Sequence, residues 1–168
     1  DSVIYLRRGM LATILGRWNG LSTTQLADIV GRAIMERRPD AVFIDGVGVG
    51  AGVVDNLTTA NFEVIEVIGG AKALNDKVYF NRRIEMYDEM RKWLRKGGMI
   101  EDDRRLRDGL TGPEYGFSGR IGQMQLESKD DMRSRGLDSP DEADALAMTF
   151  YQPVQRRETR DEAHRRRI

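Results

Sequence analysis

The sequence predicts an α/β fold, with a central mixed β-sheet flanked by helices on both faces. Two observations support this fold class. Short strand-like runs alternate with amphipathic helical runs along the chain, and one strand, a glycine-rich loop, a helix and a second strand follow one another as in a βαβ unit. A hairpin precedes that unit, so we expect the sheet to contain antiparallel as well as parallel pairs.

The chain opens with a predicted hairpin and a predicted helix. Residues 2–8 and residues 10–16 are rich in β-forming side chains and are separated by a glycine. Residues 23–38 form a predicted helix, which Ser22 is suited to cap and which Pro39 ends. Its apolar side chains recur at helical spacing on one face: Leu26, Ile29, Val30, Ala33 and Ile34.

The predicted βαβ unit comes next. Residues 41–45 are almost continuously apolar and end in Asp45, which is typical of a buried parallel strand. A glycine-rich loop over residues 46–52 leads into a helix over residues 53–60, and residues 63–68 form the second strand. Open α/β sheets bind ligands in the crevice at the carboxyl ends of their strands. Asp45 is therefore a candidate site residue.

The second half is predicted to be helical around one further hairpin. A long amphipathic helix covers residues 77–96 and ends at a glycine pair, and residues 99–100 form a candidate edge strand. Residues 114–126 have the glycines and the alternation of a hairpin. Two helices, over residues 128–135 and 140–151, complete the fold.

Composition limits the chemistry that the chain can perform. Its 168 residues carry 27 Lys and Arg against 27 Asp and Glu, with no cysteine and one histidine, His164. This leaves no disulfide, no thiolate zinc site and no histidine in the predicted core for a catalytic triad. Carboxylates that hold a hard cation such as Mg²⁺ or Mn²⁺ remain available. We expect an intracellular protein with one domain over residues 1–152 and a flexible basic tail over residues 153–168.

The closing helix carries two further candidate acids. Ser139 and Glu142 have the spacing of a capping box, which fixes the predicted start of the helix. Asp144 lies beyond the first turn, where a carboxylate beside an apolar face is costly unless a cation compensates it. Asp141 is one turn earlier on the same side and is placed to share a metal ion with it. The apolar face consists of Ala143, Leu146, Ala147 and Phe150.

The glycine-rich loop supports an alternative, a dinucleotide- or nucleotide-binding module. Gly46, Gly48 and Ala51 fit the spacing of the dinucleotide fingerprint, and Glu66 follows at the distance of a ribose-binding acid. Against this interpretation, Asp45 would bring negative charge toward the pyrophosphate. The βαβ unit also follows a hairpin in this chain, whereas dinucleotide-binding folds begin with the βαβ unit.

Basic residues form two groups along the chain, near the start of the long helix and around the last hairpin. Beside a carboxylate site they would contact DNA phosphates, and without such a site they would support a non-catalytic DNA-docking domain. The candidate DNA-binding residues are Lys72, Lys77, Arg82, Arg120, Lys129 and Arg133.

Three sequence blocks resemble a known family. Residues 41–57 (AVFIDGVGVGAGVVDNL), residues 92–103 (KWLRKGGMIEDD) and above all residues 119–150 (GRIGQMQLESKDDMRSRGLDSPDEADALAMTF) are similar to the nuclease domain of the large terminase subunit of tailed bacteriophages. The resemblance implies a ribonuclease H-like fold related to Holliday-junction resolvases. It also implies metal-dependent cleavage of concatemeric viral double-stranded DNA, with little sequence specificity, during genome packaging in the cytoplasm of the infected bacterium.

The resemblance assigns roles to individual residues. Asp45 matches the family acid at the end of the central strand, and Asp144, with Asp141 beside it, matches the acid on the closing helix. Together they would hold two Mg²⁺ or Mn²⁺ ions. The first acid of the family precedes the opening hairpin, so the resemblance implies an upstream strand that is missing before Asp1. The implied partners are DNA, the terminase ATPase domain, the portal and the small terminase subunit, with no membrane.

Overall fold

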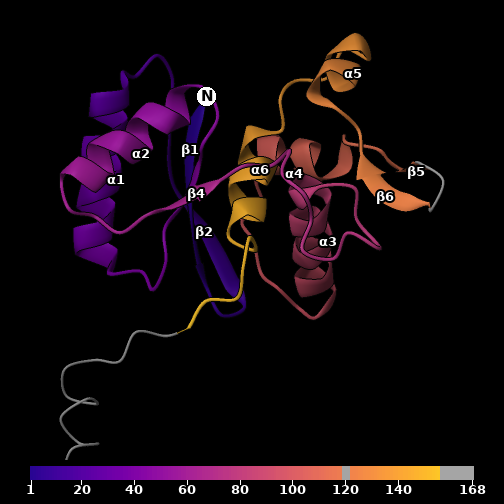
Figure 1. The fold of residues 1–168 in the computed structure, drawn as a ribbon, viewed down its shortest axis with the longest axis horizontal. Helices are drawn as coiled ribbons and strands as arrows, with labels where there is room; N and C mark the ends of the chain where they lie inside the picture. The colour runs from indigo at the N-terminus through magenta and orange to yellow at the C-terminus, as the bar shows by residue number, and fades with distance from the viewer. Residues whose placement is uncertain (119–121, 156–168) are drawn as a thin grey trace, which may run out of the picture.

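The computed structural model describes residues 1–118 and 122–155 of the chain. Arg120 and most of the predicted basic tail therefore lie outside the described residues. The described elements, shown in Figure 1, are β1 (Ser2–Arg8), β2 (Leu11–Trp18), α1 (Thr23–Arg37), β3 (Phe43–Asp45), α2 (Val49–Thr59), β4 (Ile65–Val67), α3 (Arg82–Arg95), α4 (Arg104–Thr111), β5 (Tyr115–Ser118), β6 (Gln123–Leu126), α5 (Lys129–Ser134) and α6 (Asp141–Met148).

The predicted opening hairpin is confirmed. β1 and β2 pair antiparallel, and Gly9 between them has a φ of 56°, in the left-handed region that favours glycine. Helix α1 is also confirmed: Ser22 and Gln25 form a reciprocal capping box at its start. The predicted edge strand at residues 99–100 is a single bridge, in which Met99 pairs with Leu11.

The predicted βαβ unit is present. β3 and β4 pair in parallel, and α2 connects them and packs against α1. Helix α2 begins at Val49, four residues earlier than the sequence predicts, because Gly48 with a φ of 64° turns the chain directly into the helix.

The prediction of one central sheet is not confirmed. Instead, the described residues form three two-stranded sheets: β1 with β2, β3 with β4, and β5 with β6. The fold is mixed α/β as predicted, but no hydrogen-bonded ladder connects β1 to β3 within the described part of the chain. The physical reason is that the outer edges of β1 and β3 line a pocket and do not meet.

Two helix predictions near the middle of the chain are corrected. Helix α3 begins at Arg82 and not at residue 77, because the Asn81 side chain accepts a hydrogen bond from the Ile84 amide and so caps the helix there. The preceding residues form a loop in which the Phe80 amide donates to the Met124 carbonyl of β6. Helix α4 was not predicted, because its sequence is mostly charged and shows no apolar periodicity. Its one buried large side chain is Leu106, and its N-cap is Asp103.

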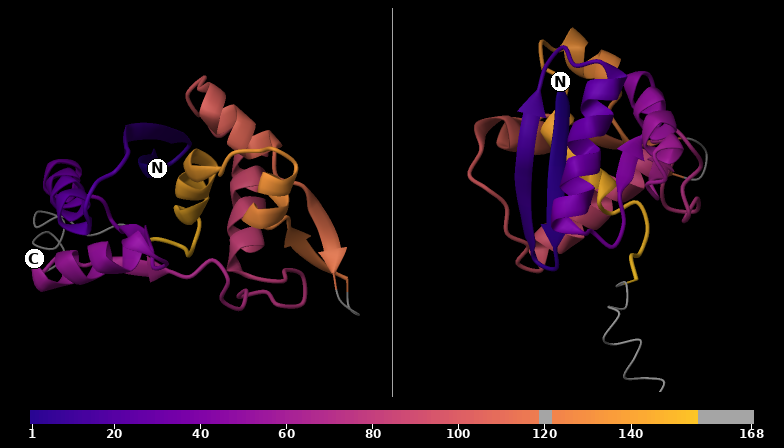
Figure 2. Two further views of the ribbon diagram at one scale, coloured as in Figure 1. Left: turned by 90° about the horizontal axis from the view of Figure 1, so that it is seen from above. Right: turned by 90° about the vertical axis from the view of Figure 1, so that its left-hand side faces the viewer.

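Helix α6 lies between the β1–β2 hairpin and α3, as Figure 2 shows from above. Its residues Ala143, Leu146 and Ala147 are fully buried in the larger of the hydrophobic clusters. The predicted capping box at its start is wrong. Pro140 is the N-cap, and Glu142 does not reach back to Ser139 because its carboxylate pairs with the Arg17 guanidinium of β2 at 2.7 Å.

Helices in the described part of the chain are too short or too polar to cross a membrane.

Candidate functional site

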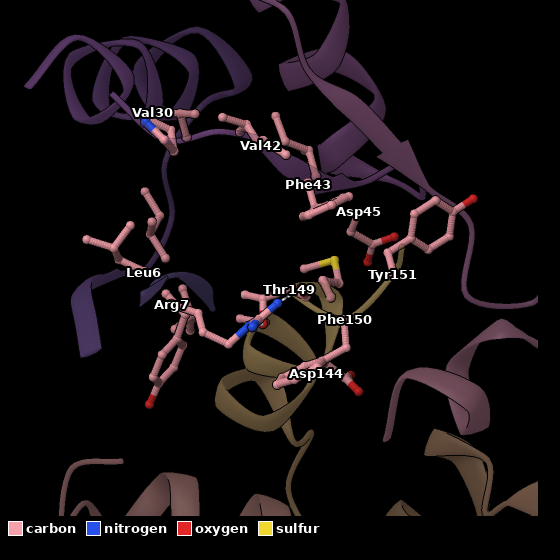
Figure 3. A pocket seen from close by; sticks show the side chains of 18 of the residues that line it. Leu6, Arg7, Val30, Val42, Phe43, Asp45, Asp144, Thr149, Phe150 and Tyr151 are labelled. Carbon is pink, nitrogen blue, oxygen red and sulfur yellow. Dashed lines mark hydrogen bonds between the residues drawn. The ribbon is translucent and has the colours of Figure 1, made fainter. Parts of the chain in front are cut away.

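The three candidate acids line one pocket, which we call the central pocket. It has a volume of about 1340 Å³ and is bordered by β1, α1, β3 and α6. Asp45 enters it from β3, and Asp141 and Asp144 enter it from α6; Figure 3 shows Asp45 and Asp144 with the apolar side chains around them. Acids that are about 100 residues apart in sequence thus line the same pocket.

Asp45 occupies the exposed carboxyl end of β3, and the turn that follows fixes its backbone. One carboxylate oxygen, Oδ1, accepts a hydrogen bond from the Val47 amide at 3.1 Å. The next residue along the chain, Gly46, donates its amide to the Val67 carbonyl of β4. A Cβ at Gly50 would lie 1.7 Å from the Asp45 carbonyl oxygen, so only glycine allows helix α2 to start this close to the strand.

The negative charge of Asp144 is compensated by neighbouring side chains of the protein. Its Oδ1 accepts hydrogen bonds from the Tyr87 hydroxyl at 2.7 Å and from Arg83 Nε at 3.2 Å, while Lys129 Nζ lies 2.6 Å from Oδ2. The carboxylate is 19% exposed, so these cations supply much of what water would otherwise provide. Burial, followed by the negative charge of Asp144, raises the pKa of Tyr87 well above its ordinary value and keeps its hydroxyl protonated as a donor.

Asp141 has different partners although it shares a helix with Asp144. The N-terminal ammonium of Asp1 lies 2.9 Å from its Oδ2, and the Ser139 hydroxyl donates to its Oδ1 at 2.6 Å. Burial alone would raise the pKa of Asp141, but the Ser139 hydrogen bond and the Asp1 ammonium outweigh it and lower that pKa. Asp141 is therefore ionised at neutral pH, with a cation already beside it.

The candidate acids offer the kind of ligand atom that a hard cation prefers, but too few of them lie close together. Carboxylate oxygens suit Mg²⁺, Mn²⁺ and Ca²⁺. Within residues 1–118 and 122–155, however, no three acidic or histidine side chains lie close enough together to hold a metal ion. The described residues thus present carboxylates on two sides of the central pocket and lack a further ligand between them.

The candidate DNA-binding residues have divergent environments. Lys77 is exposed, Lys72 is exposed and paired with Asp76, and Arg133 is exposed and paired with Asp130. Lys129, at the rim of the central pocket, is engaged with Asp144. Arg82 is only 4% exposed and is paired with Glu85 inside the protein, which leaves it no surface for a phosphate.

Sequence reasoning missed two residues of this site, Arg83 and Tyr87. They lie four residues apart on α3, so they share a face of that helix, and this face meets Asp144. The sequence prediction had grouped Arg83 with Arg82 as basic residues at the start of the long helix, but it gave neither arginine a role beside Asp144.

The glycine-rich loop has a structural explanation that needs no nucleotide. A Cβ at Gly46 would lie 2.3 Å from Cγ of Glu66, the acid that would bind a ribose, and Gly48 has a positive φ. Together with Gly50, these glycines let β3, β4 and α2 approach one another closely.

Solved structures provide the decisive comparison. The nuclease domain of the large terminase subunit gp2 of bacterial virus Sf6, solved as a point mutant with manganese, superposes with a TM-score of 0.71 at 20% sequence identity, covering 89% of this chain and 82% of that chain. The same domain with calcium gives a TM-score of 0.69 at 22% identity, covering 89% and 81%. This chain has the fold of a terminase nuclease domain.

The terminase nuclease fold is thus established by structure and not by sequence. No family model matches the chain, and no curated protein matches it. A third structure, the Sf6 nuclease domain, has a TM-score of 0.67 at 21% identity over 89% of this chain. The resemblance expected from the sequence blocks is therefore confirmed at the level of the fold.

Proposed function

We propose that this chain is the nuclease domain of a large terminase subunit, a metal-dependent endonuclease that cuts concatemeric viral double-stranded DNA during genome packaging. One observation carries the proposal: a chain with the terminase nuclease fold places Asp45 and Asp144 on one pocket, from a strand end and from the closing helix. Its site of action would be the cytoplasm of the infected bacterium.

Divalent cations are the proposed cofactor. The Sf6 nuclease domain has been solved with manganese and with calcium, and the acids of this chain offer the same kind of oxygen ligands. Asp45 and Asp144 would hold the cations, with Asp141 beside them. When bound, a pair of Mg²⁺ or Mn²⁺ ions would activate a water and stabilise the leaving oxygen of the phosphodiester.

The protein's own groups would orient the acids and bind the DNA backbone. Tyr87 and Arg83 would fix the orientation of the Asp144 carboxylate through their hydrogen bonds to it. Exposed Lys77, Lys72 and Arg133 would contact phosphates, which accounts for binding with little sequence specificity. The ATPase domain, portal and small subunit of a terminase would be its partners in packaging.

A non-catalytic DNA-docking domain is a second candidate. It is favoured by the finding that the described residues contain no group of three ligands able to hold a metal ion. Dinucleotide binding is disfavoured, since Gly46 is explained by the close approach of the Glu66 side chain and Gly48 by its positive φ.

Three measurements separate these functions. The nuclease proposal expects supercoiled plasmid to be nicked and linearised in Mn²⁺, and expects Asp45→Asn and Asp144→Asn to abolish cleavage while DNA binding is retained. Binding without cleavage at any Mn²⁺ or Mg²⁺ concentration would instead support the docking domain. A thermal-shift comparison of Mn²⁺, Mg²⁺ and NAD tests the nucleotide alternative, which alone expects stabilisation by NAD.

A further inference from the structure

Four arginines converge at one end of the central pocket. Arg7 and Arg8 end β1, while Arg37 and Arg38 end α1. The Arg8 guanidinium donates a hydrogen bond to the Arg37 carbonyl at 3.3 Å, so the two pairs are neighbours although they come from different elements. All four residues line the pocket, and we call them the arginine cluster.

The tertiary structure creates this cluster. β1 and α1 run in the same direction, as the right-hand view of Figure 2 shows, so their carboxyl ends lie at the same end of the molecule. Arg8 and Arg37 are 29 residues apart in the sequence. The distribution of charge along the chain therefore does not reveal the cluster, and none of its members was among the candidate DNA-binding residues.

Arg7 is held in a fixed position with part of its hydrogen-bonding capacity unused. Its Nε donates to the Thr149 hydroxyl at 3.0 Å, and a terminal nitrogen donates to the Thr149 carbonyl at 2.7 Å. The guanidinium also lies over the Phe150 ring, 4.2 Å from the ring centre (Figure 3). A guanidinium has more N–H groups than these two bonds use, and the others have no acceptor among the described residues.

The arginine cluster carries more positive charge than the protein compensates. None of its four members forms an ion pair with a described residue, and Arg7 and Arg8 instead donate to carbonyls at the carboxyl ends of α6 and α1. Each helix end supplies about half a negative charge. Asp40, which follows Arg38 closely and lines the same pocket, supplies one more. About two positive charges thus remain for an anion from outside the protein.

Arg38 occupies a backbone position that glycine would fill more favourably. Its φ of 47° and ψ of 56° are left-handed, and its amide donates to the Ile34 carbonyl at the end of α1. Helices commonly end in this conformation with glycine, because an L side chain is strained there. The Arg38 side chain is exposed and forms no hydrogen bond or ion pair with a described residue. A charged side chain at a strained position without a stabilising contact indicates a role in binding.

We propose that the arginine cluster binds the phosphate backbone of duplex DNA, at a site separate from the acids that would cut it. Guanidinium groups pair with phosphate oxygens through parallel N–H bonds and are more weakly hydrated than ammonium groups. A duplex presents a continuous row of phosphates, which suits several arginines held together. This inference rests on the proposed function, which supplies DNA as the anion.

The cluster lies some distance along the pocket from the amino end of α6. β1 begins beside Asp141 and reaches Arg7 about six residues later, which corresponds to about 20 Å at the rise of a β-strand. Phosphates of one DNA strand follow one another every 3.4 Å or so along the helix axis, so this distance spans about six base pairs. The cluster would therefore hold the duplex about half a helical turn away from the cut and fix its direction across the site.

Removing two members of the cluster tests the proposal. Binding of labelled duplexes is measured by fluorescence anisotropy without divalent metal ions, so that no cleavage occurs. In Arg37→Ala/Arg38→Ala the dissociation constant should rise at least about tenfold at about 0.1 M salt, equally for unrelated sequences, and the slope of log K against log salt should fall by about 2.

A second pair of exposed arginines provides the matched control. Arg104→Ala/Arg107→Ala removes the same charge from α4, where each arginine already has an acidic partner. The dissociation constant of this variant should change less than about threefold, since its charges are compensated within the protein. Equal effects in the two double variants would overturn the proposal, because they would reflect the net charge of the protein and not a site.

Arg38→Gly separates binding from folding. Glycine relieves the left-handed backbone, so the urea midpoint of unfolding should stay the same or rise. DNA binding should nevertheless weaken by at least about threefold, because one phosphate contact is lost. DNA affinity equal to that of the parent protein would remove Arg38 from the site and leave it as a helix end only.

The outcomes are separable from the fate of the proposed function. Mn²⁺-dependent cleavage by the parent protein, with unchanged DNA binding in Arg37→Ala/Arg38→Ala, would retain the nuclease and refute the cluster. Weaker binding in that variant, with no cleavage by the parent protein, would retain the cluster and refute the nuclease. If inorganic phosphate raises the melting temperature of the parent but not of the variant, and both bind DNA equally, the site belongs to free phosphate and the DNA contact is refuted.

Discussion

The Lys129 ammonium lies 2.6 Å from Oδ2 of Asp144, at the rim of the central pocket. A protein cation thus stands beside the carboxylate that the proposed function assigns to a metal ion. Lys129 comes from α5 and is 37% exposed, so this contact can open without disturbing the core.

Replacing Lys129 should therefore strengthen metal binding. In Lys129→Ala the ammonium no longer competes for Oδ2, and we expect Mn²⁺ to bind about tenfold more tightly, a gain of roughly 1.4 kcal/mol, in isothermal titration calorimetry. Arg133→Ala removes one positive charge from the same helix, where it pairs with Asp130, and should leave Mn²⁺ affinity unchanged. Equal affinities in all three proteins would show that Lys129 does not compete with the metal.

Asp45 should be required for stabilisation by metal. A ligand present at ten times its dissociation constant stabilises the native state by about 1.4 kcal/mol, which thermal unfolding can detect. We expect this Mn²⁺-dependent increase in melting temperature to disappear in Asp45→Asn. The matched control is Asp28→Asn, which removes an exposed carboxylate from α1 and should keep the full increase. A retained increase in Asp45→Asn would place the metal elsewhere.

Gly50→Ala should damage the turn that positions Asp45. The added Cβ would lie 1.7 Å from the Asp45 carbonyl oxygen, so β3 and α2 must move apart. We expect a loss of about 1–3 kcal/mol in the free energy of unfolding, measured with urea, together with weaker Mn²⁺ binding. Gly70→Ala adds the same methyl group where no atom lies within 4 Å and should be nearly neutral. Equal stability of the two variants would contradict this account.

Asp88 should make the free energy of unfolding decrease as the pH becomes acidic. Burial alone would raise its pKa, but hydrogen bonds from Tyr79, Arg91 and Lys92 outweigh burial and lower it. Because the folded pKa is lower than the unfolded one, the contribution of Asp88 is fully present above the unfolded pKa of about 3.9 and is lost as pH falls through the folded pKa.

The corresponding experiment compares Asp88→Asn with the parent protein in urea. At pH 7 the variant should be less stable by about 1.5–3 kcal/mol, since charge-assisted hydrogen bonds are lost to a carboxylate that is only 5% exposed. At pH 3 the difference in the free energy of unfolding between the variant and the parent protein should be smaller. A difference that is constant with pH would mean that the carboxylate charge does not contribute.

DNA binding should depend on salt through the exposed basic residues. If Lys77 contacts a phosphate, Lys77→Ala should weaken binding equally to unrelated DNA sequences and reduce the slope of log K against log salt by about 1 in fluorescence anisotropy. Lys92→Ala is the control, because this lysine is already engaged with Asp88 and Glu89. An unchanged slope for Lys77→Ala would remove it from the interface.

Local sequence signals predicted much of the fold. Ser22 and Pro39 bracket α1, and the apolar run ending in Asp45 identified β3, because caps, breakers and periodicity act over a few residues. Helix α4 escaped prediction, since one buried leucine among charged residues gives almost no periodic signal. The single central sheet was not confirmed, for a different reason: strand pairing depends on which strand edges meet, and no local sequence pattern determines that.

In the candidate site, too, local sequence patterns pointed to some residues, while others depend on tertiary packing. Asp45 and Asp144 could be chosen as candidates because an acid at a strand end and an acid beside an apolar helix face both stand out locally. The partners of Asp144 could not be found this way. Arg83 and Tyr87 meet it only through the packing of α3 on α6, which no local sequence pattern reveals.

The ion pair between Asp1 and Asp141 has a consequence for any longer form of the protein. An α-ammonium exists only on the first residue of a polypeptide, and attaching even one amino acid replaces it with a neutral amide. Asp141 would then lose its nearest positive charge, its pKa would move back toward the ordinary value, and its carboxylate would be free for another cation. In any longer chain, the charge balance at Asp141 would therefore lack the contribution of the Asp1 ammonium.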